Sequence, residues 1–343
     1  MQIRDVVVVG ASAGGVEVLR TMVAGLPAGF PAAVLIVLHL APGSPSVLAA
    51  ILQRRCALPV AFARDGEPLA PGRVWIAPPD RHLVVEPDRL RLTRAPRENH
   101  SRPAIDPLFR SAALAYGPRV VAVVLSGRLD DGTAGAWAVK DRGGVLVVQD
   151  PADALHADMP RNAMAHTAPD HVVHDDELAP LLVRLAGTPA DAAPGPPAPT
   201  LETEVRIAME EQALGAGVLT LGPPSPYTCP DCHGVLMRAD DGVPRFRCHT
   251  GHAYSFDSLL ASTSESAEAA LWGAVRAVEE TALLLREAAT RTSRGDGGEF
   301  AAQLARTAAD AQTRADAVRE AAMRHRAVSL EAVRADDAAA PGG

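Results

Sequence analysis

Short apolar runs alternate with longer stretches that Gly and Pro interrupt, from residue 3 to about residue 175. The runs are rich in Val, Ile and Leu, and they fall at residues 3–9, 33–38, 74–77, 120–125 and 145–148. Continuous apolar runs of this length are typical of strands covered on both faces, as in a parallel sheet with crossover helices. The pattern predicts an α/β domain over residues 1–185, with a Rossmann-like, doubly wound and mostly parallel sheet.

The second half of the chain is organised differently. Residues 187–200 are rich in Pro, Ala and Gly, a composition that favours a stiff spacer over a packed core. We therefore expect a linker with one short helix over residues 186–226 and a compact Cys/His segment over 227–256. A helical hairpin over 257–333 and a disordered tail over 334–343 would follow.

Apolar residues recur every three or four positions along two stretches of the predicted hairpin. They are Leu271, Val275, Val278, Ala282 and Leu285, and then Phe300, Leu304, Ala308, Ala311, Ala315 and Val318. A Gly-rich break at residues 295–298 separates the stretches, and Ser262 with Glu265 has the spacing of a capping box. Each helix has one apolar stripe, which must pair with the other helix, another subunit or the α/β domain.

The charge balance excludes some partners. The chain has 343 residues, with 33 basic and 41 acidic side chains and a formal net charge of −8. No Lys/Arg run provides the phosphate-neutralising surface that nucleic-acid binding requires.

No stretch approaches the roughly 18 apolar residues of a membrane span, and no signal-peptide core is present. We expect a cytoplasmic protein that binds no nucleic acid and does not insert into membranes.

The first predicted strand ends in a Gly-rich turn, residues 10–15, with the sequence GASAGG. A dinucleotide fold would need Gly at position 12 and an acidic residue after the next strand, where His39 stands instead. Glycines on both sides of Ser12 fit a sharp strand-to-helix turn that presents a hydroxyl at a helix N-terminus. Ser12 is therefore either a nucleophile or a helix cap.

A serine nucleophile needs a general base and a group that orients this base. His39 follows the second predicted strand, and Asp130 and Asp131 follow the strand at residues 120–125. Because the carboxyl ends of parallel strands lie along one edge of a sheet, these side chains can meet there. The chain order Ser, His, Asp differs from the Ser, Asp, His of α/β-hydrolases. A half-buried histidine and a helix-capping aspartate are the alternative explanations.

Several ordered motifs in residues 3–185 together resemble the catalytic domain of CheB, the chemotaxis protein-glutamate methylesterase. Besides GASAGG and His39, these motifs are Asp65-Gly66-Glu67, residues 76–82 (IAPPDRH), residues 101–106 (SRPAID), Leu125-Ser126-Gly127 with Asp131-Gly132, and Met159-Pro160-Arg161. The resemblance implies that Ser12 is the nucleophile, His39 the base and Asp131 the residue that orients the base. Asp130 is the less favoured partner.

The resemblance also implies a reaction. It is the hydrolysis of glutamate γ-methyl esters on a methylated, helical, chemoreceptor-like protein with release of methanol, and in some members deamidation of glutamine. Backbone N–H groups near Ala13 and Arg128 are candidates for the oxyanion hole, and His82 and Arg102 are candidates for substrate contacts. No cofactor is needed for this catalysis. The runner-up is a non-catalytic signalling or scaffold module with a degenerate CheB-like domain.

This sequence departs from the family pattern in three places. Many relatives have Met-Gly where this chain has Arg128-Leu129, so the mouth of the site gains a cation. Ala13 stands where a hydroxyl residue often follows the nucleophile. The chain begins at the catalytic strand, so we expect no receiver domain before it and no phosphorylation control within it.

We also expect a signalling partner to dock on the C-terminal helices.

The Cys/His segment has the spacing of a metal site. Cys229 and Cys232 form a C-x-x-C pair, and Cys248 and His252 follow. Three Cys and one His suit a structural Zn²⁺ ion, because four protein ligands leave no open position for chemistry. His249 and His233 are alternative fourth ligands, and His252 is preferred because Gly251-His252 resembles the C-terminal segment of stand-alone CheB-like proteins. Three reduced cysteines without a metal are the alternative.

Three further residues have weaker signals. His171 and His174 are spaced as a metal-ligand pair, but the same spacing is typical of an edge strand. Cys56 is most simply a small buried hydrophobe.

Overall fold

The computed structural model describes residues 2–43, 46–192, 194–210, 212–293, 298–326 and 328. Residue contacts divide the chain into two compact units, Met1–Ser258 and Leu259–Gly343. The first unit contains the α/β domain and the Cys/His segment, and the second contains most of the helical hairpin. The tail predicted over residues 334–343 lies outside the described residues.

A parallel sheet forms the centre of the first unit. Within the described residues it has seven strands in the order β3-β4-β2-β1-β7-β8-β9, and all six pairings are parallel. The strands are β1 (Val6–Ala11), β2 (Ala33–Leu38), β3 (Val60–Phe62), β4 (Arg73–Ile76), β7 (Val120–Val124), β8 (Val145–Gln149) and β9 (His171–Val173). The predicted doubly wound, mostly parallel sheet is confirmed.

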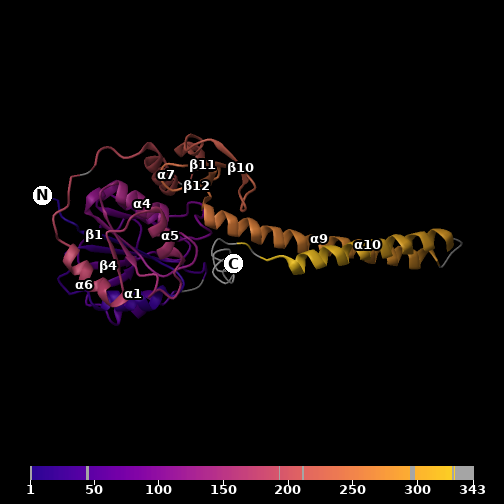
Figure 1. The fold of residues 1–343 in the computed structure, drawn as a ribbon, viewed down its shortest axis with the longest axis horizontal. Coiled ribbons are helices and arrows are strands. Elements are labelled where there is room, and N and C mark those ends of the chain that lie inside the picture. The colour runs from indigo at the N-terminus through magenta and orange to yellow at the C-terminus, as the bar shows by residue number, and fades with distance from the viewer. Residues whose placement is uncertain are drawn as a thin grey trace, which may run out of the picture. The chain divides into compact units, whose positions relative to one another are not determined.

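Helices cover both faces of this sheet. Val6 and Val8 of β1 pack into one core with α3 (Ile105–Tyr116), α4 (Thr133–Asp141) and α5 (Asp158–His166). Val7 and Val9 pack into the other core with α1 (Gly15–Ala24), α2 (Leu48–Gln53) and α6 (Asp175–Leu185). Figure 1 shows α1 and α6 on one side of the strands and α4 on the other. Burial on both faces explains why the strands are continuously apolar.

The topology places a switch point between β1 and β7 at the carboxyl edge of the sheet. The chain leaves β1 for α1 on one face and leaves β7, the neighbour of β1, for α4 on the other face. Loops that diverge in this way leave room between them, and ligands of such sheets bind there. The antiparallel hairpin of β5 (His82–Glu86) and β6 (Arg89–Thr93) packs beside α3.

The remainder of the first unit is a small sheet preceded by helices. The helices are α7 (Pro199–Glu210), α8 (Ala213–Ala216) and the 3-10 turn η2 (Val218–Thr220). The antiparallel sheet comprises β10 (Pro224–Thr228), β11 (Val235–Ala239), β12 (Arg245–Cys248) and β13 (Ala253–Ser255). Leu201 and Val205 of α7 are buried in the core that contains α3. The stretch expected to be a linker therefore includes a helix packed on the α/β domain.

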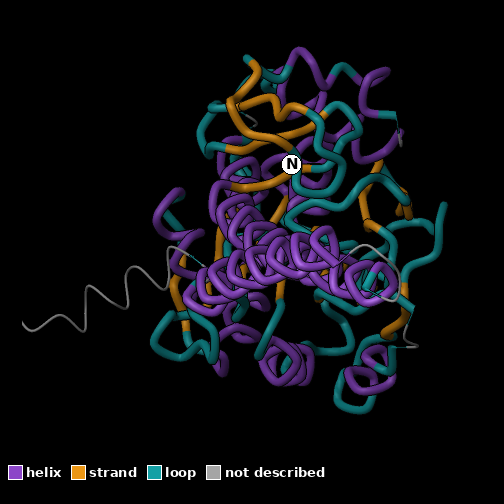
Figure 2. Tube along the Cα trace, turned by 90° about the vertical axis from the view of Figure 1, so that its right-hand side faces the viewer, coloured by secondary structure: helices purple, strands orange, loops and turns teal. Residues whose placement is uncertain are grey.

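The helical hairpin consists of α9 (Phe256–Thr292) and α10 (Gly298–Arg324), which lie side by side in Figures 1 and 2. Arg286 of α9 donates to Gln312 of α10 at 2.9 Å, and Ala282, Ala308 and Ala315 are buried. The apolar stripes thus pair with each other. The predicted capping box is wrong, since Ser262 and Glu265 lie inside α9. The helix instead begins after Ser255, whose Oγ accepts from Ser258 N–H at 3.1 Å.

Candidate active site

Ser12 lies in the turn between β1 and α1, at the carboxyl edge of the sheet. Its N–H donates to Ser126 O at 2.9 Å, and its carbonyl accepts from Gly15 N–H at 3.0 Å. Gly14 is left-handed, with φ 78°, and a Cβ at this position would lie 2.7 Å from Ser126 Oγ. Both the backbone conformation and the close approach require glycine. The Gly-rich sequence therefore allows the sharp turn that exposes the Ser12 hydroxyl.

The structure brings Ser12, His39 and Asp131 into one hydrogen-bonded chain. Ser12 Oγ lies 3.0 Å from His39 Nδ1, and His39 Nε2 lies 2.7 Å from Asp131 Oδ2. His39 directly follows β2, and Asp131 lies in the loop between β7 and α4. The His39 side chain is 20% exposed and that of Asp131 only 3%. The histidine is thus open to a ligand, whereas the aspartate behind it is shielded from water.

The His39 ring is turned relative to the familiar arrangement of serine proteases. In those enzymes Nε2 faces the serine and Nδ1 faces the aspartate. Here Nδ1 faces Ser12 and Nε2 faces Asp131. A neutral ring that accepts from the serine and donates to the aspartate must then hold its proton on Nε2. Either nitrogen can act as a base, so the reversed ring is chemically competent.

Asp131 is a buried carboxylate with several hydrogen-bond donors. Its Oδ2 accepts from Ile105 N–H at 2.7 Å, and its Oδ1 accepts from Asn99 Nδ2 at 3.0 Å and from Asp106 N–H at 3.3 Å. Burial opposes ionisation of this carboxyl, but the hydrogen bonds from His39, Ile105 and Asn99 lower its pKa below the usual value. Because Ile105 and Asp106 open α3, the helix N-terminus also favours the negative charge. Asp131 is therefore held as an anion.

Asp130, the less favoured partner of His39 in the sequence, points elsewhere. Its Oδ1 accepts from Ser255 Oγ at 2.5 Å. Burial raises the pKa of Asp130 well above its usual value, although the Ser255 hydrogen bond opposes this shift. The geometry thus favours Asp131 over Asp130 as the partner of His39.

Ala13 and Arg128, the candidate oxyanion donors, flank Ser12 on two loops. In the part of the chain that the structure describes, neither backbone N–H donates a hydrogen bond, whereas Gly127 N–H donates to His156 O at 3.0 Å. The Arg128 side chain is exposed. Two N–H groups without an acceptor beside the nucleophile remain candidates for the oxyanion hole.

His82 and Arg102 do not reach the triad. His82 is fully buried, with Nε2 3.1 Å from Pro96 O and Nδ1 accepting from Ala104 N–H at 3.2 Å. Both ring nitrogens of His82 thus have partners within the protein, and its substrate contact stays a prediction. Arg102 pairs with Asp80 at 2.7 Å and donates to a backbone carbonyl, so it stabilises the loop that precedes α3.

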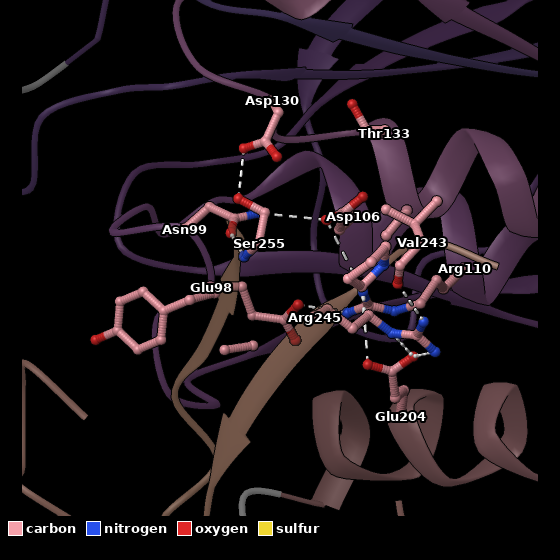
Figure 3. A pocket seen from close by; sticks show the side chains of 14 residues that line it. Glu98, Asn99, Asp106, Arg110, Asp130, Thr133, Glu204, Val243, Arg245 and Ser255 are labelled. Atoms are coloured by element: carbon pink, nitrogen blue, oxygen red, sulfur yellow. Dashed lines mark hydrogen bonds and ion pairs between the residues drawn. The ribbon is translucent and has the colours of Figure 1, made fainter. Parts of the chain in front are cut away.

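Asn99 is a site residue that the sequence analysis missed. Its Nδ2 donates to Asp131 at 3.0 Å and to Asp106 at 3.2 Å. Figure 3 shows Asn99 beside Asp106 and Ser255. The sequence contains one weak signal, because Asn99 stands two positions before the SRPAID motif. Its contact with Asp131, however, depends on the folded turn.

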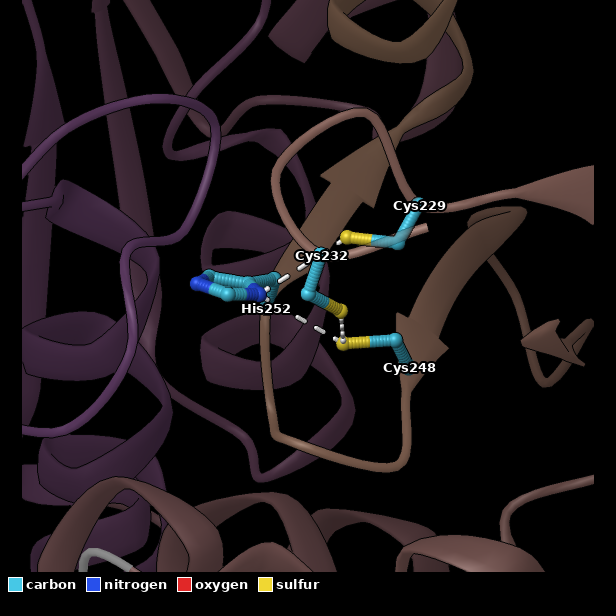
Figure 4. Close-up of side chains that lie close together, drawn as sticks. All are labelled: Cys229, Cys232, Cys248 and His252. Atoms are coloured by element: carbon cyan, nitrogen blue, oxygen red, sulfur yellow. Dashed lines mark hydrogen bonds between the residues drawn. The ribbon is translucent and has the colours of Figure 1, made fainter. Parts of the chain in front are cut away.

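The Cys/His segment brings its four predicted ligands together (Figure 4). The ligand atoms of Cys229, Cys232, Cys248 and His252 all lie within 4.8 Å of one another. Cys232 Sγ is 3.6 Å from Cys248 Sγ, and His252 Nδ1 is 3.6 Å from Cys248 Sγ. A tetrahedron with metal–sulfur bonds of about 2.3 Å has edges of roughly 3.8 Å, so the spacing fits a metal ion. His252 completes the set, whereas His249 and His233 do not belong to it.

Among the residues that the structure describes, this is the one group of three or more His, Cys, Asp or Glu side chains able to share a metal ion. His174 instead lies at the start of α6, where its backbone N–H donates to Glu177 at 3.2 Å. Cys56 is buried, as expected.

In the same described ranges, no helix is both long and apolar enough to cross a membrane.

Comparison with known proteins identifies the first half of the chain. The family model described as CheB methylesterase matches residues 7–182 of this chain. A relative from Leptospira interrogans is 36% identical over 182 residues, which are 53% of this chain and 94% of the relative. A relative from Anaeromyxobacter dehalogenans, named protein-glutamate methylesterase/protein-glutamine glutaminase 2, is 43% identical over 174 residues, 51% of each chain.

A solved structure has the same fold. The crystal structure of the Thermotoga maritima CheB methylesterase catalytic domain is 33% identical and matches with a TM-score of 0.52, covering 54% of this chain and 100% of that one. The family match includes the strand tips that carry Ser12, His39 and Asp131 and ends before the Cys/His segment. The chain belongs to the CheB methylesterase family.

Proposed function

We propose that this protein is a protein-glutamate methylesterase whose catalytic triad is Ser12, His39 and Asp131. The observation that carries the proposal is the hydrogen-bonded chain from Ser12 Oγ through His39 to Asp131. A hydroxyl, a base and a buried anion in this order are the parts that ester hydrolysis by serine requires. The name of the Anaeromyxobacter dehalogenans relative points to the same reaction and to glutamine deamidation as a second activity.

The reaction proceeds in two halves. Ser12 Oγ attacks the γ-carbonyl carbon of a methylated glutamate while His39 Nδ1 takes the serine proton. The tetrahedral intermediate collapses, and methanol leaves with the proton from His39. Water, deprotonated by His39, then attacks the acyl-enzyme. The bond to Ser12 Oγ breaks, Ser12 Oγ takes the proton from His39, and glutamate is released. With a glutamine substrate ammonia leaves in place of methanol.

Two backbone groups and one carboxylate support these steps. The N–H groups of Ala13 and Arg128 donate to the oxyanion of the tetrahedral intermediate. Asp131 accepts from Nε2 of His39, which holds the ring in the required tautomer and stabilises its positive charge after proton transfer.

We propose that the Cys3His cluster binds a structural Zn²⁺ ion. The donor set of three sulfurs and one nitrogen suits zinc, and the interatomic spacing supports a tetrahedral site. When bound, the ion would tie β12 and β13 to the turn that carries Cys229 and Cys232. It has no part in the ester chemistry, because four protein ligands saturate it.

The substrate class that we propose is the one that membership of the CheB methylesterase family implies. It is a methylated, chemoreceptor-like helical protein in the cytoplasm, and a signalling partner would dock on the C-terminal helices. A non-catalytic signalling or scaffold module remains the second candidate, since the Cys/His segment and the hairpin lie outside the family match.

Methanol release separates the two candidates. Wild-type protein is expected to release methanol from a receptor fragment methylated at glutamate, and Ser12→Ala to lose this activity. Equal release by both proteins would eliminate the serine mechanism, and no release by the wild type would favour the scaffold.

A further inference from the structure

Asn99 lies at the tip of a tight turn between the loop that carries Asp131, residues 125–132, and the C-terminal part of the first unit. Glu98 and Ser101 exchange two backbone hydrogen bonds around it, at 3.3 and 2.9 Å. The two central residues, Asn99 and His100, are left-handed, with φ of 47° and 64°. Such turns favour Asn, because a short amide side chain tolerates this backbone region. The turn fixes the direction of the Asn99 side chain.

The Asn99 amide uses its full hydrogen-bonding capacity. Nδ2 donates to Asp131 Oδ1 at 3.0 Å and to Asp106 Oδ2 at 3.2 Å. Oδ1 accepts from Ser255 N–H and from Ser258 Oγ, both at 2.9 Å. If the Asn99 amide were rotated by 180°, its oxygen would face the carboxyls of Asp131 and Asp106. Its NH₂ would then face the N–H donor of Ser255. Asn99 therefore has one satisfied orientation, and this orientation aims two N–H bonds at carboxylates.

The two groups that hold Asn99 come from the end of the Cys/His segment and from the start of the helix that follows it. Ser255 closes β13, which begins one residue after His252, and Ser258 lies in the first turn of α9. The backbone repeats the link, since Asn99 N–H donates to Ala253 O at 2.9 Å. Figure 3 shows Ser255 between Asn99 and Asp130.

A buried ionic network fixes the same turn to the Cys/His segment. Glu98 pairs with Arg110 of α3 and, at 2.8 Å, with Arg247 of β12. Arg247 also lies 3.4 Å from Glu204 of α7. The side chains of all four residues are at most 3% exposed. If the turn moved, Glu98 would separate from its arginine partners and leave buried charges uncompensated. These contacts therefore strongly favour one placement of the turn.

We propose that Asn99 is a positioning residue for Asp131, and that Ser255 and Ser258 hold Asn99 in place. The Cys/His segment then contributes to catalysis without touching the substrate. This inference rests on the proposed function, because it assigns Asn99 a role through the orienting acid of the triad.

The electrostatics of the two carboxyls agree with this role. Burial, and next the negative charge of Asp131, raise the pKa of Asp106 to about 7. The pKa of Asp131 is lowered instead, and the Asn99 hydrogen bond is one of the contributions that lower it. Asn99 thus helps to keep the charge on the carboxyl that faces His39.

The test is a double-mutant cycle. Asn99→Gly removes the amide but tolerates the left-handed backbone of the turn. In full-length protein with a methylated receptor fragment, we expect Asn99→Gly to lower kcat by about tenfold to a hundredfold with KM unchanged within about twofold. In the Asp131→Ala background the same substitution should change kcat by less than about twofold, because Asn99 acts only through Asp131. A merely structural role would lower kcat equally in both backgrounds.

Ser258→Ala tests the C-terminal part of the proposal. It removes one of the two donors to Asn99 Oδ1, and we expect kcat to fall by about twofold to tenfold. The effect should vanish in the Asn99→Gly background. Ser225→Ala is the matched control, since Ser225 Oγ accepts from Tyr227 N–H in exposed β10. Its kcat should equal that of the wild type.

The ring ¹⁵N shifts of His39 provide a readout that needs no substrate. Asn99→Gly should move them in the same direction as Asp131→Asn does. Unchanged shifts in a folded Asn99→Gly protein, or a kcat equal to wild type, would overturn the inference. Full activity of Ser12→Ala would instead overturn the proposed function, and the shifts would still decide the role of Asn99.

Discussion

His39 meets Ser12 through Nδ1, at 3.0 Å from the serine Oγ, and this contact leaves Nε2 for Asp131 at 2.7 Å. The nitrogen that faces the serine determines which nitrogen must hold the proton in the neutral ring. The histidine of this triad is therefore expected to be the Nε2–H tautomer, opposite to that of the serine proteases.

The tautomer is directly measurable. We expect the ¹⁵N spectrum of neutral His39 to show a protonated Nε2 and an unprotonated Nδ1. Asp131→Asn should disturb this pattern and lower kcat by about a thousandfold to ten-thousandfold, since the ring loses the acceptor that fixes it. A wild-type ring with its proton on Nδ1 would contradict the geometry.

Gly127 is expected to be essential for the position of Ser12. A Cβ at residue 127 would clash with Met159 Sδ and lie 2.8 Å from Ser12 Cβ. Gly127→Ala should lower the free energy of unfolding by about 1–3 kcal/mol and should also lower kcat, because the Ser12 backbone has to shift. Urea unfolding and methanol release measure the two effects.

Gly29→Ala is the control for this substitution, since a Cβ there meets nothing within 4 Å. Its unfolding free energy should stay within about 0.5 kcal/mol of the wild type. A Gly127→Ala protein with wild-type stability and activity would show that the packing around Ser12 is looser than described.

The Cys3His cluster should hold about one zinc ion per chain in protein purified without chelator. Cys229→Ser combined with Cys232→Ser should abolish the metal content and lower the melting temperature, because binding of the ion favours the folded segment. Cys56→Ser, which changes a buried thiol outside the cluster, should keep the metal. Elemental analysis that finds the same zinc content in all three proteins would refute the site.

Asp130 should make stability depend on pH. Burial raises its pKa well above the usual 3.8, so the native state holds a proton that the unfolded chain releases. Since the unfolded state binds fewer protons above about pH 4, the unfolding free energy falls as the pH rises toward the native pKa. This one group contributes a slope of up to about 1.4 kcal/mol per pH unit.

Asp130→Asn removes this slope and keeps an oxygen that accepts from Ser255. Urea unfolding at several pH values from 5 to 8 should therefore show a flatter profile for Asp130→Asn than for the wild type. Asp106, whose pKa is also raised, contributes in the same direction in both proteins. Parallel profiles would mean that Asp130 is ionised in the native state.

Local patterns in the sequence explain which features were predictable. The parallel sheet follows from continuously apolar runs. The places of Ser12, His39, Asp130 and Asp131 after predicted strands made them candidates, and the resemblance to the CheB family selected Asp131 over Asp130. The three cysteines of the Cys3His cluster follow from ligand spacing, and a resemblance to stand-alone CheB-like proteins selected His252 as the fourth ligand. Each of these features depends on short stretches whose periodicity or residue type carries the information.

Features that depend on distant parts of the chain were not predictable. Asn99 and the start of α3 reach Asp131 only in the folded protein. The SRPAID motif next to Asn99 is a weak signal that does not show these contacts. The stretch that contains α7 was predicted to be a linker with one short helix, because residues 187–200 are rich in Pro, Ala and Gly. In the structure Glu204 is buried against Arg245 of β12 at 2.6 Å. Ion pairs between distant segments can bury charges that a linear pattern assigns to the surface.

The most direct test of the account is whether Ser12 carries the acyl group during turnover. A peptide that contains a methylated glutamate is mixed with the wild-type protein, and the reaction is quenched within the first turnover. The protein is then digested, and the mass of the peptide that contains Ser12 is measured by mass spectrometry. We expect this peptide to gain the mass of the substrate minus methanol, and Ser12→Ala to show neither the adduct nor methanol release. Methanol release at the wild-type rate by Ser12→Ala, with no adduct on the wild-type protein, would contradict the account.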